Sequence, residues 1–248
     1  MHCPKRGADL PDTGAECPRC GVIVAKYLER DKPVPRDTNL DRDRDMEPRD
    51  PAALFLGAGP ATSMAAAVGR GILLLLLALW TTTLVPDGVS AERVNSSFLH
   101  LPNLVFHEAG HILFIPLGRF MTVLGGSLTQ VLVPLVCAGA FLWQTRDTFA
   151  AAAALWWAGE NLIDVAPYIN DARDLKLVLL GGKTGAEVEG HDWEYLLNAM
   201  GVAHRDHLIA AIVQAIGTLT MIGALVWGAI VVSNQMGILR SGRTKPWS

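Results

Sequence analysis

The sequence predicts an all-α membrane protein, a bundle of about four to six spanning or re-entrant helices with a small, zinc-ribbon-like N-terminal head. Half of the 248 residues are hydrophobic, and the charges are unevenly spread. The first 50 residues hold 21 of the 45 Lys, Arg, Asp and Glu, whereas residues 207–239 hold none. A soluble domain intersperses its charges more evenly. The net charge of −3 and the lack of a basic stripe argue against nucleic acid as a partner.

The N-terminal head, residues 1–28, contains a C-x-x-C pair at Cys17 and Cys20 with Cys3 upstream. This spacing resembles a zinc ribbon, but Arg6 stands where a cysteine should close the first pair. Because structural zinc takes four ligands, we favour a degenerate ribbon, and three thiolates with an unidentified fourth donor are the alternative. Unpaired cysteines suit a reducing compartment. The head is also a candidate surface for a protein partner.

Residues 29–60 are rich in Arg, Asp and Pro and predict a flexible linker, because such a segment buries little apolar surface. A membrane domain follows over 61–239, with a polar insertion outside the membrane at 170–206 and a basic tail at 240–248. A helical span needs about 20 predominantly apolar residues. Five segments approach this length: 71–85 with the small residues before it, 98–117, 121–143, 148–169 and 207–239.

The sequence leaves two alternatives for the orientation of these segments in the membrane. The basic N-terminal part favours a cytoplasmic start, yet five full crossings would place the basic tail on the opposite side. Either one segment is re-entrant, for which 98–117 with Pro102 and Pro116 is the candidate, or the tail departs from the positive-inside rule.

The strongest motif is His107-Glu108-Ala109-Gly110-His111, an H-E-x-x-H. From this composition the pattern is expected by chance roughly 0.007 times per chain. Residues four apart lie on one face of a helix, so both imidazoles can bind one Zn²⁺ while Glu108 takes a proton from the attacking water. Ionisable groups in an apolar segment are costly and indicate a functional site.

A third zinc ligand must come from elsewhere, since a catalytic zinc usually has three protein ligands. Glu160, Asp164, Tyr168 and Asp171 follow at steps of four, four and three and so share one helical stripe. The alternative for Asp171 is that it belongs to the solvated end of that helix.

The H-E-x-x-H followed by Asn161, Pro167 and Asp171 resembles the site-2 protease family of intramembrane zinc metalloproteases. The resemblance implies that Asp171 is the third ligand and that Asn161 binds the substrate backbone or the oxyanion. The run is about two residues longer than the family pattern, so Asp164 is a rival ligand and Glu160 a weaker candidate. Gly125-Gly126-Ser127 stands where the family has a glycine-rich stretch. The resemblance also implies a bacterial cytoplasmic membrane.

Two further polar positions have competing interpretations. We favour Asp192 as the N-cap of a helix over 192–200, and the alternative is that His191 or Asp192 reaches back to the zinc. Gln130 is isolated in an apolar segment, where a hydrogen bond between helices explains it.

The sequence thus predicts a membrane zinc metallopeptidase with one catalytic Zn²⁺, acting in the lipid bilayer on a membrane protein or peptide. Two alternatives remain, a zinc hydrolase of a lipid or other amphiphile and a non-catalytic metal-binding scaffold. Glu108 disfavours the scaffold, because metal binding alone needs no general base.

Overall fold

The computed structural model describes residues 20, 23, 55–57, 63–86 and 88–241. The chain divides into two units, 1–49 and 50–248, and the fold below is that of the second. Cys3 and Cys17 of the predicted ribbon and residues 29–54 of the predicted linker lie outside the described residues. The described part of the second unit is helical and contains no strand: α4 (Met64–Leu84), α5 (Ala91–Ser96), α6 (His100–Phe114), η1 (Ile115–Leu117), α7 (Arg119–Trp143), α8 (Thr148–Asn170), α9 (Asp192–Ala199), η2 (Ala203–Arg205) and α10 (Asp206–Arg240).

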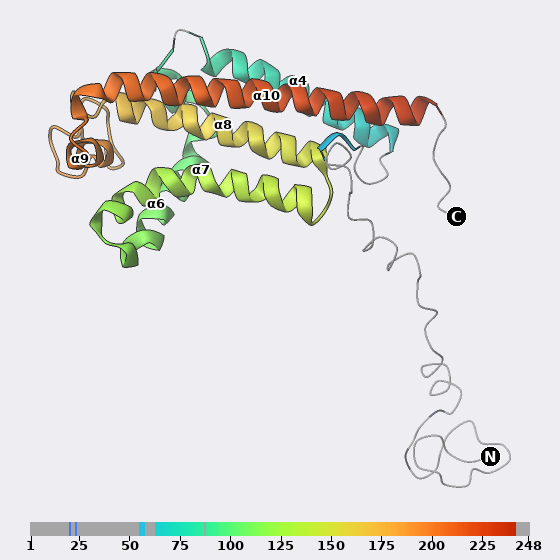
Figure 1. Ribbon diagram of the computed structural model, residues 1–248, viewed down its shortest axis with the longest axis horizontal. Helices are drawn as coiled ribbons and strands as arrows, with labels where there is room; N and C mark the ends of the chain where they lie inside the picture. The colour runs from blue at the N-terminus through green and yellow to red at the C-terminus, as the bar shows by residue number, and fades with distance from the viewer. Residues whose placement is uncertain (1–19, 21–22, 24–54, 58–62, 87, 242–248) are drawn as a thin grey trace. The chain divides into compact units, whose positions relative to one another are not determined.

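Four long helices, α4, α7, α8 and α10, lie side by side, with α8 between α7 and α10 (Figure 1). Helix α8 is the centre of the bundle, because 16 of its 23 residues are buried. It runs antiparallel to α10, and the two backbones meet at Gly159 and Gly217. Helix α4 is antiparallel to α10 as well, since Gly71 near its start faces Val232 and Met236.

Three of the helices are long and apolar enough to cross a membrane, namely α4, α7 and the run Ala203–Arg240 that contains α10. They correspond to three of the five predicted segments, which confirms that the chain is compatible with an integral membrane protein. Helix α8 is long but falls outside this group, because it carries Glu160, Asn161 and Asp164 among alanines. Neighbouring helices bury these polar groups, so α8 is enclosed by protein and does not form the outer surface of the bundle.

The second predicted segment, 98–117, turns back within the bundle and does not run its full length, which is the shape expected of a re-entrant hairpin. Helix α6 has only 15 residues. Its first residue, His100, contacts Asp164 inside the bundle, and its His111 contacts Thr122 near the start of α7. The segment between α4 and α7 therefore enters the bundle from one end and returns to that end before α7 begins. Pro102 lies in the first turn of α6, where proline is tolerated, and so does not interrupt the helix.

The first residue of α4 and the last residue of α10 consequently lie at one end of the bundle (Figure 1). Arg70 of α4 forms an ion pair with Asp147 at the start of α8 at this end, with 2.8 Å between Nη2 and Oδ2. The carbonyl of Phe55 accepts a hydrogen bond from the Trp227 indole, and the carbonyl of Gly57 accepts one from Thr148. Phe55 and Gly57 of the predicted linker thus pack on the helices.

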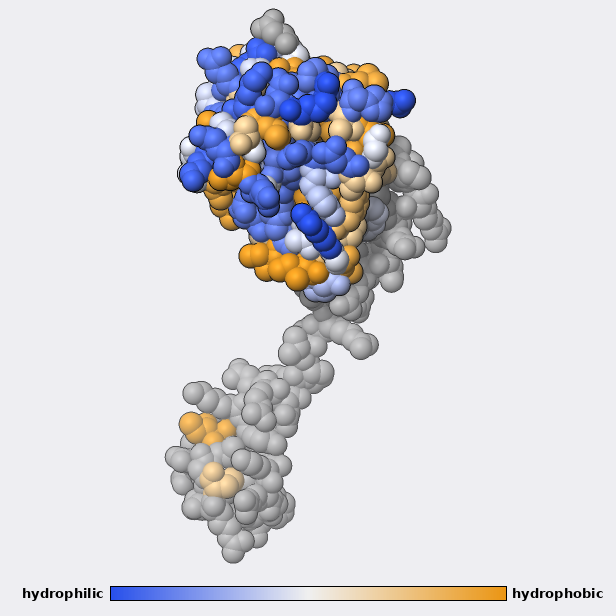
Figure 2. Space-filling model, turned by 90° about the vertical axis from the view of Figure 1, so that its left-hand side faces the viewer, coloured by the Kyte–Doolittle hydropathy of each residue, from blue (hydrophilic) through white to orange (hydrophobic). Residues whose placement is uncertain are grey.

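The opposite end is covered by the polar segment 171–205, which contains α9. Figure 2 looks onto this end and shows that hydrophilic residues cover most of it. The segment has one isolated antiparallel bridge, Val178 with Thr184. The prediction that Asp192 caps α9 is wrong: the N-cap is His191, whose side chain accepts the backbone N–H of Glu194. Asp192 is thereby free to point into the bundle.

The α8–α10 contact generates a prediction about helix packing. A Cβ at Gly217 would lie 2.7 Å from the Gly159 carbonyl oxygen, whereas a Cβ at Gly223 of the same helix would meet nothing within 4 Å. Gly217→Ala should therefore destabilise the protein by about 1–3 kcal/mol through overpacking, and Gly223→Ala should not. Thermal unfolding in detergent measures the difference. Equal midpoints for the two variants would contradict the close approach of α8 and α10.

Candidate metal centre

The two histidines of the H-E-x-x-H lie on the face of α6 that packs against α7. Their ring centroids are 4.9 Å apart. Helix α7 approaches this face closely because it carries Gly125 and Gly126 there: a Cβ on Gly110 of α6 would overlap the Gly125 carbonyl. A Cβ on Gly126 would lie 2.6 Å from His107 Nε2 and 2.7 Å from His111 Nε2. The glycine pair therefore leaves space for the imidazoles and for whatever they bind.

The third donor of the cluster is Asp192, at the start of α9. Its Oδ2 lies 3.0 Å from His107 Nε2 and 3.2 Å from His111 Nε2. These three residues form the one group of metal-ligand type found among the described residues. Zinc bonds of about 2.0–2.1 Å in a tetrahedron separate the donor atoms by roughly 3.4 Å, which is close to the separations seen here.

Three contacts hold Asp192 over the histidines. Its backbone N–H donates to the hydroxyl oxygen of Tyr168 on α8, at 3.0 Å. The indole N–H of Trp193 donates to Ser127 Oγ on α7, at 3.1 Å. Tyr195, further along α9, stacks under the guanidinium of Arg119, with 4.6 Å from Cζ to the ring centroid. The short helix is thus fixed to both α7 and α8, although it lies in the polar segment.

The hydrogen bonds of the imidazoles determine which nitrogen faces the centre. His107 Nδ1–H donates to Gln130 Oε1 at 3.1 Å, and His111 Nδ1–H donates to the Thr122 carbonyl at 2.9 Å. In the neutral rings both Nε2 atoms then carry lone pairs, which point toward the Asp192 carboxylate. Three such atoms that converge on one point need a proton or a metal ion between them. The donor set of two Nε2 atoms and one carboxylate oxygen therefore fits Zn²⁺, and the outer hydrogen bonds are those that orient zinc-binding histidines.

The charge states outside the membrane segments agree with this arrangement. Burial disfavours ionisation of Asp192, but its contacts with His107 and His111 outweigh that cost and hold its pKa below the usual aspartate value. The carboxylate is therefore ionised, as a metal ligand must be. Burial lowers the pKa of His191, which favours the neutral ring that its acceptor role at the N-terminus of α9 requires.

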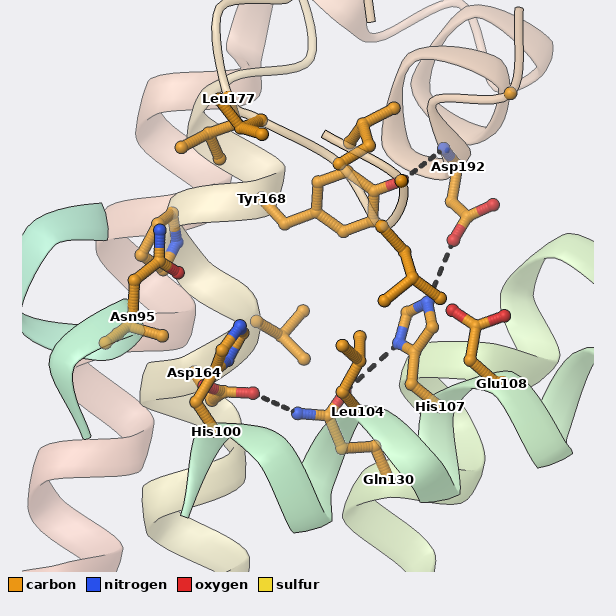
Figure 3. A pocket seen from close by; sticks show the side chains of 18 of the residues that line it. Asn95, His100, Leu104, His107, Glu108, Gln130, Asp164, Tyr168, Leu177 and Asp192 are labelled. Atoms are coloured by element: carbon orange, nitrogen blue, oxygen red, sulfur yellow. Dashed lines mark hydrogen bonds and ion pairs between the residues drawn. The ribbon is translucent and has the colours of Figure 1, made fainter. Parts of the chain in front are cut away.

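A cavity of about 760 Å³ opens beside the three donors. The carboxylate of Glu108 lines it and lies next to His107, on the side where Asp192 descends from above (Figure 3). The hydroxyl-bearing ring of Tyr168 forms another part of the wall, and Leu104 and Leu177 contribute apolar surface. The arrangement places a metal-binding cluster, a carboxylate base and a phenol around one space that a substrate can enter.

The structure does not bring the predicted carboxylate ligands of α8 to the histidines. Asp171 accepts the backbone N–H groups of Lys176 and Leu177, each at 2.9 Å, and so holds the loop after α8. Asp164 accepts a hydrogen bond from Gln130 and pairs with His100. Glu160 is buried and accepts from the Asn103 amide at 2.8 Å. Glu160 and Asp164 of the predicted stripe do face α6, but they lie to one side of the metal cluster.

Asn161 is also displaced from its expected role. Its amide Nδ2 donates to the Trp157 carbonyl of its own helix at 2.8 Å, and the residue is fully buried outside the cavity. It therefore offers no donor to a substrate in the cavity. The Tyr168 hydroxyl is better placed, because it lines the cavity, and its oxygen accepts from the Asp192 N–H.

Two residues of the site escaped the favoured sequence interpretation. Asp192 was open only as the alternative to a helix cap, because a carboxylate before an amphipathic helix is typical of an N-cap. Gln130 looked like an ordinary interhelical contact. Two signals were available in the sequence: Asp192 stands beside the cap residue of a helix, and Gln130 is an amide deep in an apolar segment. Neither signal identifies the partner of the residue without the fold.

No protein-family model matches the chain, and no curated protein or solved structure matches it either. The chemistry of the site therefore depends on its own geometry.

The geometry predicts which aspartate holds the metal. Asp192→Ala should weaken zinc binding by at least about 100-fold, since it removes a direct ligand, whereas Asp171→Asn should change it little. Competition with a chromophoric chelator on the full chain in detergent measures the affinity, with Cys17→Ser in every variant so that the N-terminal cysteines do not contribute. Asp174→Ala, in the exposed loop, is the control. A larger loss in Asp171→Asn than in Asp192→Ala would return the ligand role to Asp171.

Proposed function

We propose that the chain is an integral membrane, zinc-dependent metallopeptidase that hydrolyses peptide bonds in or near the bilayer. The observation that carries the proposal is the convergence of His107, His111 and Asp192 beside the Glu108 carboxylate in one cavity. The resemblance to the site-2 protease family supports it at the H-E-x-x-H. Our proposed third ligand departs from that family's pattern, because it comes from the polar segment after α8.

His107, His111 and Asp192 would hold a zinc ion, which would supply Lewis acidity to polarise a peptide carbonyl and to acidify a water molecule. Glu108 accepts the proton of that water as its oxygen bonds to the carbonyl carbon, and then delivers the proton to the amine nitrogen as the C–N bond breaks. The Tyr168 hydroxyl donates a hydrogen bond to the carbonyl oxygen, where negative charge develops. The apolar wall around Leu104 and Leu177 holds an uncharged, extended stretch of substrate.

The charges of the cavity favour a peptide over a phospholipid. Among its described lining residues are four carboxylates, those of Glu108, Asp164, Glu189 and Asp192, and neither lysine nor arginine. A phosphate group would meet like charge and, apart from the metal, find only histidines as cationic partners. A neutral apolar peptide meets no such penalty. A scaffold role is disfavoured because the metal cluster needs no Glu108 to form.

The orientation follows from the re-entrant hairpin. If α4, α7, α8 and α10 all cross the membrane, the first residue of α4 and the last residue of α10 lie on the same side, which is the re-entrant alternative of the sequence. Arg70 pairs with Asp147 at that end, Arg146 lies in the loop between α7 and α8, and Arg240 is the last residue of α10. The sequence continues with Arg243 and Lys245. By the positive-inside rule we assign this end to the cytoplasm, with a bacterial cytoplasmic membrane as the expected location. The cavity then opens toward the opposite face.

The proposed chemistry predicts a separation of binding from catalysis. Glu108→Gln should bind zinc as tightly as the wild type but lose about 10²–10⁴-fold in hydrolysis, because an amide accepts no proton. The assay uses a quenched fluorescent peptide with an apolar core, reconstituted with the protein in vesicles. The same vesicles, made of phosphatidylethanolamine and phosphatidylglycerol, are assayed for released fatty acid and headgroup. Lipid release with intact peptide would reject the peptidase in favour of the lipid hydrolase.

The topology predicts that the cavity and the C-terminus are labelled from opposite sides. Single cysteines at Lys183 and Ser241, both exposed, are compared in a chain whose native cysteines are replaced by serine. An impermeant maleimide should label Lys183→Cys in intact cells and Ser241→Cys only after permeabilisation. The reverse pattern would place the cavity on the cytoplasmic side.

A further inference from the structure

A line of buried polar side chains leads from His107 away from the metal cluster and across three helices. Gln130 of α7 accepts the His107 Nδ1–H at 3.1 Å. The amide nitrogen of Gln130 donates in turn to Asp164 Oδ2 on α8, and Asp164 Oδ1 lies 2.8 Å from His100 Nδ1 on α6 (Figure 3). Gln130 is 3 % exposed and Asp164 8 %, so water competes little for these bonds.

The direction of each bond in this line is fixed by the carboxylate. An ionised aspartate only accepts hydrogen bonds, so Gln130 must present its NH₂ group to Asp164. The Gln130 carbonyl oxygen is then the atom that faces His107, and an amide oxygen also only accepts. His107 must therefore carry its proton on Nδ1, which leaves the Nε2 lone pair directed at Asp192 and the metal position.

We propose that Asp164 and Gln130 are positioning residues that set the tautomer of His107 and thereby make its Nε2 a metal ligand. The inference rests on the proposed function, because it concerns the same metal cluster. It gives Asp164 a role that needs no contact with the metal: the carboxylate acts through the Gln130 amide. His100 completes the line by donating to the second oxygen of Asp164 and holding the carboxylate in place.

The line also explains why the two histidines are supported differently. The partner of His111 is the backbone carbonyl of Thr122, which cannot rotate or exchange donor for acceptor. The partner of His107 is a side-chain amide, which could turn over and present NH₂ instead. Such a reversal would favour the Nε2–H tautomer and remove the lone pair from the metal position. A fixed acceptor beyond the amide is therefore required, and Asp164 supplies it.

The test is a rescue experiment on zinc affinity. Asp164→Asn keeps the shape of the side chain but lets its NH₂ group donate to the Gln130 oxygen, which turns the amide over. Zinc binding should weaken by about 10–100-fold, the usual effect of losing an outer partner of a histidine ligand. The double variant Asp164→Asn with Gln130→Glu restores an acceptor-only group beside His107 and keeps the total charge. Its affinity should return to within a few-fold of the wild type.

Glu160→Gln is the matched control, since it makes the same change from carboxylate to amide one turn earlier on α8. Glu160 bonds to Asn103 and has no connection to His107, so its variant should bind zinc like the wild type. Zinc affinity is measured by chelator competition in the Cys17→Ser chain, and Co²⁺ absorption reports the donor set of each variant. Thermal unfolding of each variant shows whether it is folded.

The outcomes separate this inference from the proposed function. Wild-type affinity in Asp164→Asn, or a double variant as weak as the single one, would overturn the positioning role, whatever the peptidase assay gives. A loss in Glu160→Gln equal to that in Asp164→Asn would overturn it too, because a general effect of buried charge would then suffice. A wild-type chain that binds zinc and shows the rescue but cleaves no peptide would overturn the peptidase alone.

Discussion

The arrangement of the helices depends on one constraint: polar groups inside an apolar bundle need partners, because apolar neighbours supply no hydrogen bonds. The metal cluster is the severe case, since two imidazole nitrogens and a carboxylate oxygen converge on one point. Acceptors so close together repel one another unless a proton or a metal ion lies between them. The bonds that surround them, from Gln130, Thr122 and Tyr168, are what keep the three donor atoms turned inward.

The backbone satisfies this constraint by close helix approach. Glycines at the α6–α7 contact allow the imidazoles to reach α7, and glycines at the α8–α10 contact bring the centre of the bundle together. Helix α8 can then carry Glu160, Asn161 and Asp164 because its neighbours enclose them. Apolar side chains remain on the outer faces of α4, α7 and α10, where the bilayer can solvate them.

The re-entrant hairpin connects the fold to the chemistry. By returning to the end it left, the segment that holds α5 and α6 opens a space between itself, α8 and the loop after α8. A fully crossing helix at this position would have filled that space with side chains. The polar segment then closes the end of the bundle and delivers Asp192 on α9 to the histidines. One insertion thus serves as a cover and as a ligand donor.

Local pattern determined the helices and the H-E-x-x-H, because periodicity and hydropathy act over short stretches of chain. The sequence by itself therefore predicted five apolar segments, three of which are the membrane-compatible helices of the structure. It also placed His107 and His111 on one helical face and gave 98–117 as the candidate re-entrant segment. Only the tertiary structure decided that Asp192 rather than Asp171 meets the histidines, and that Asp164 contacts Gln130 and His100 instead. Both pairings join residues far apart in the chain, and their direction is set by helix packing and by which hydrogen-bond partner each buried group finds, which no local pattern encodes.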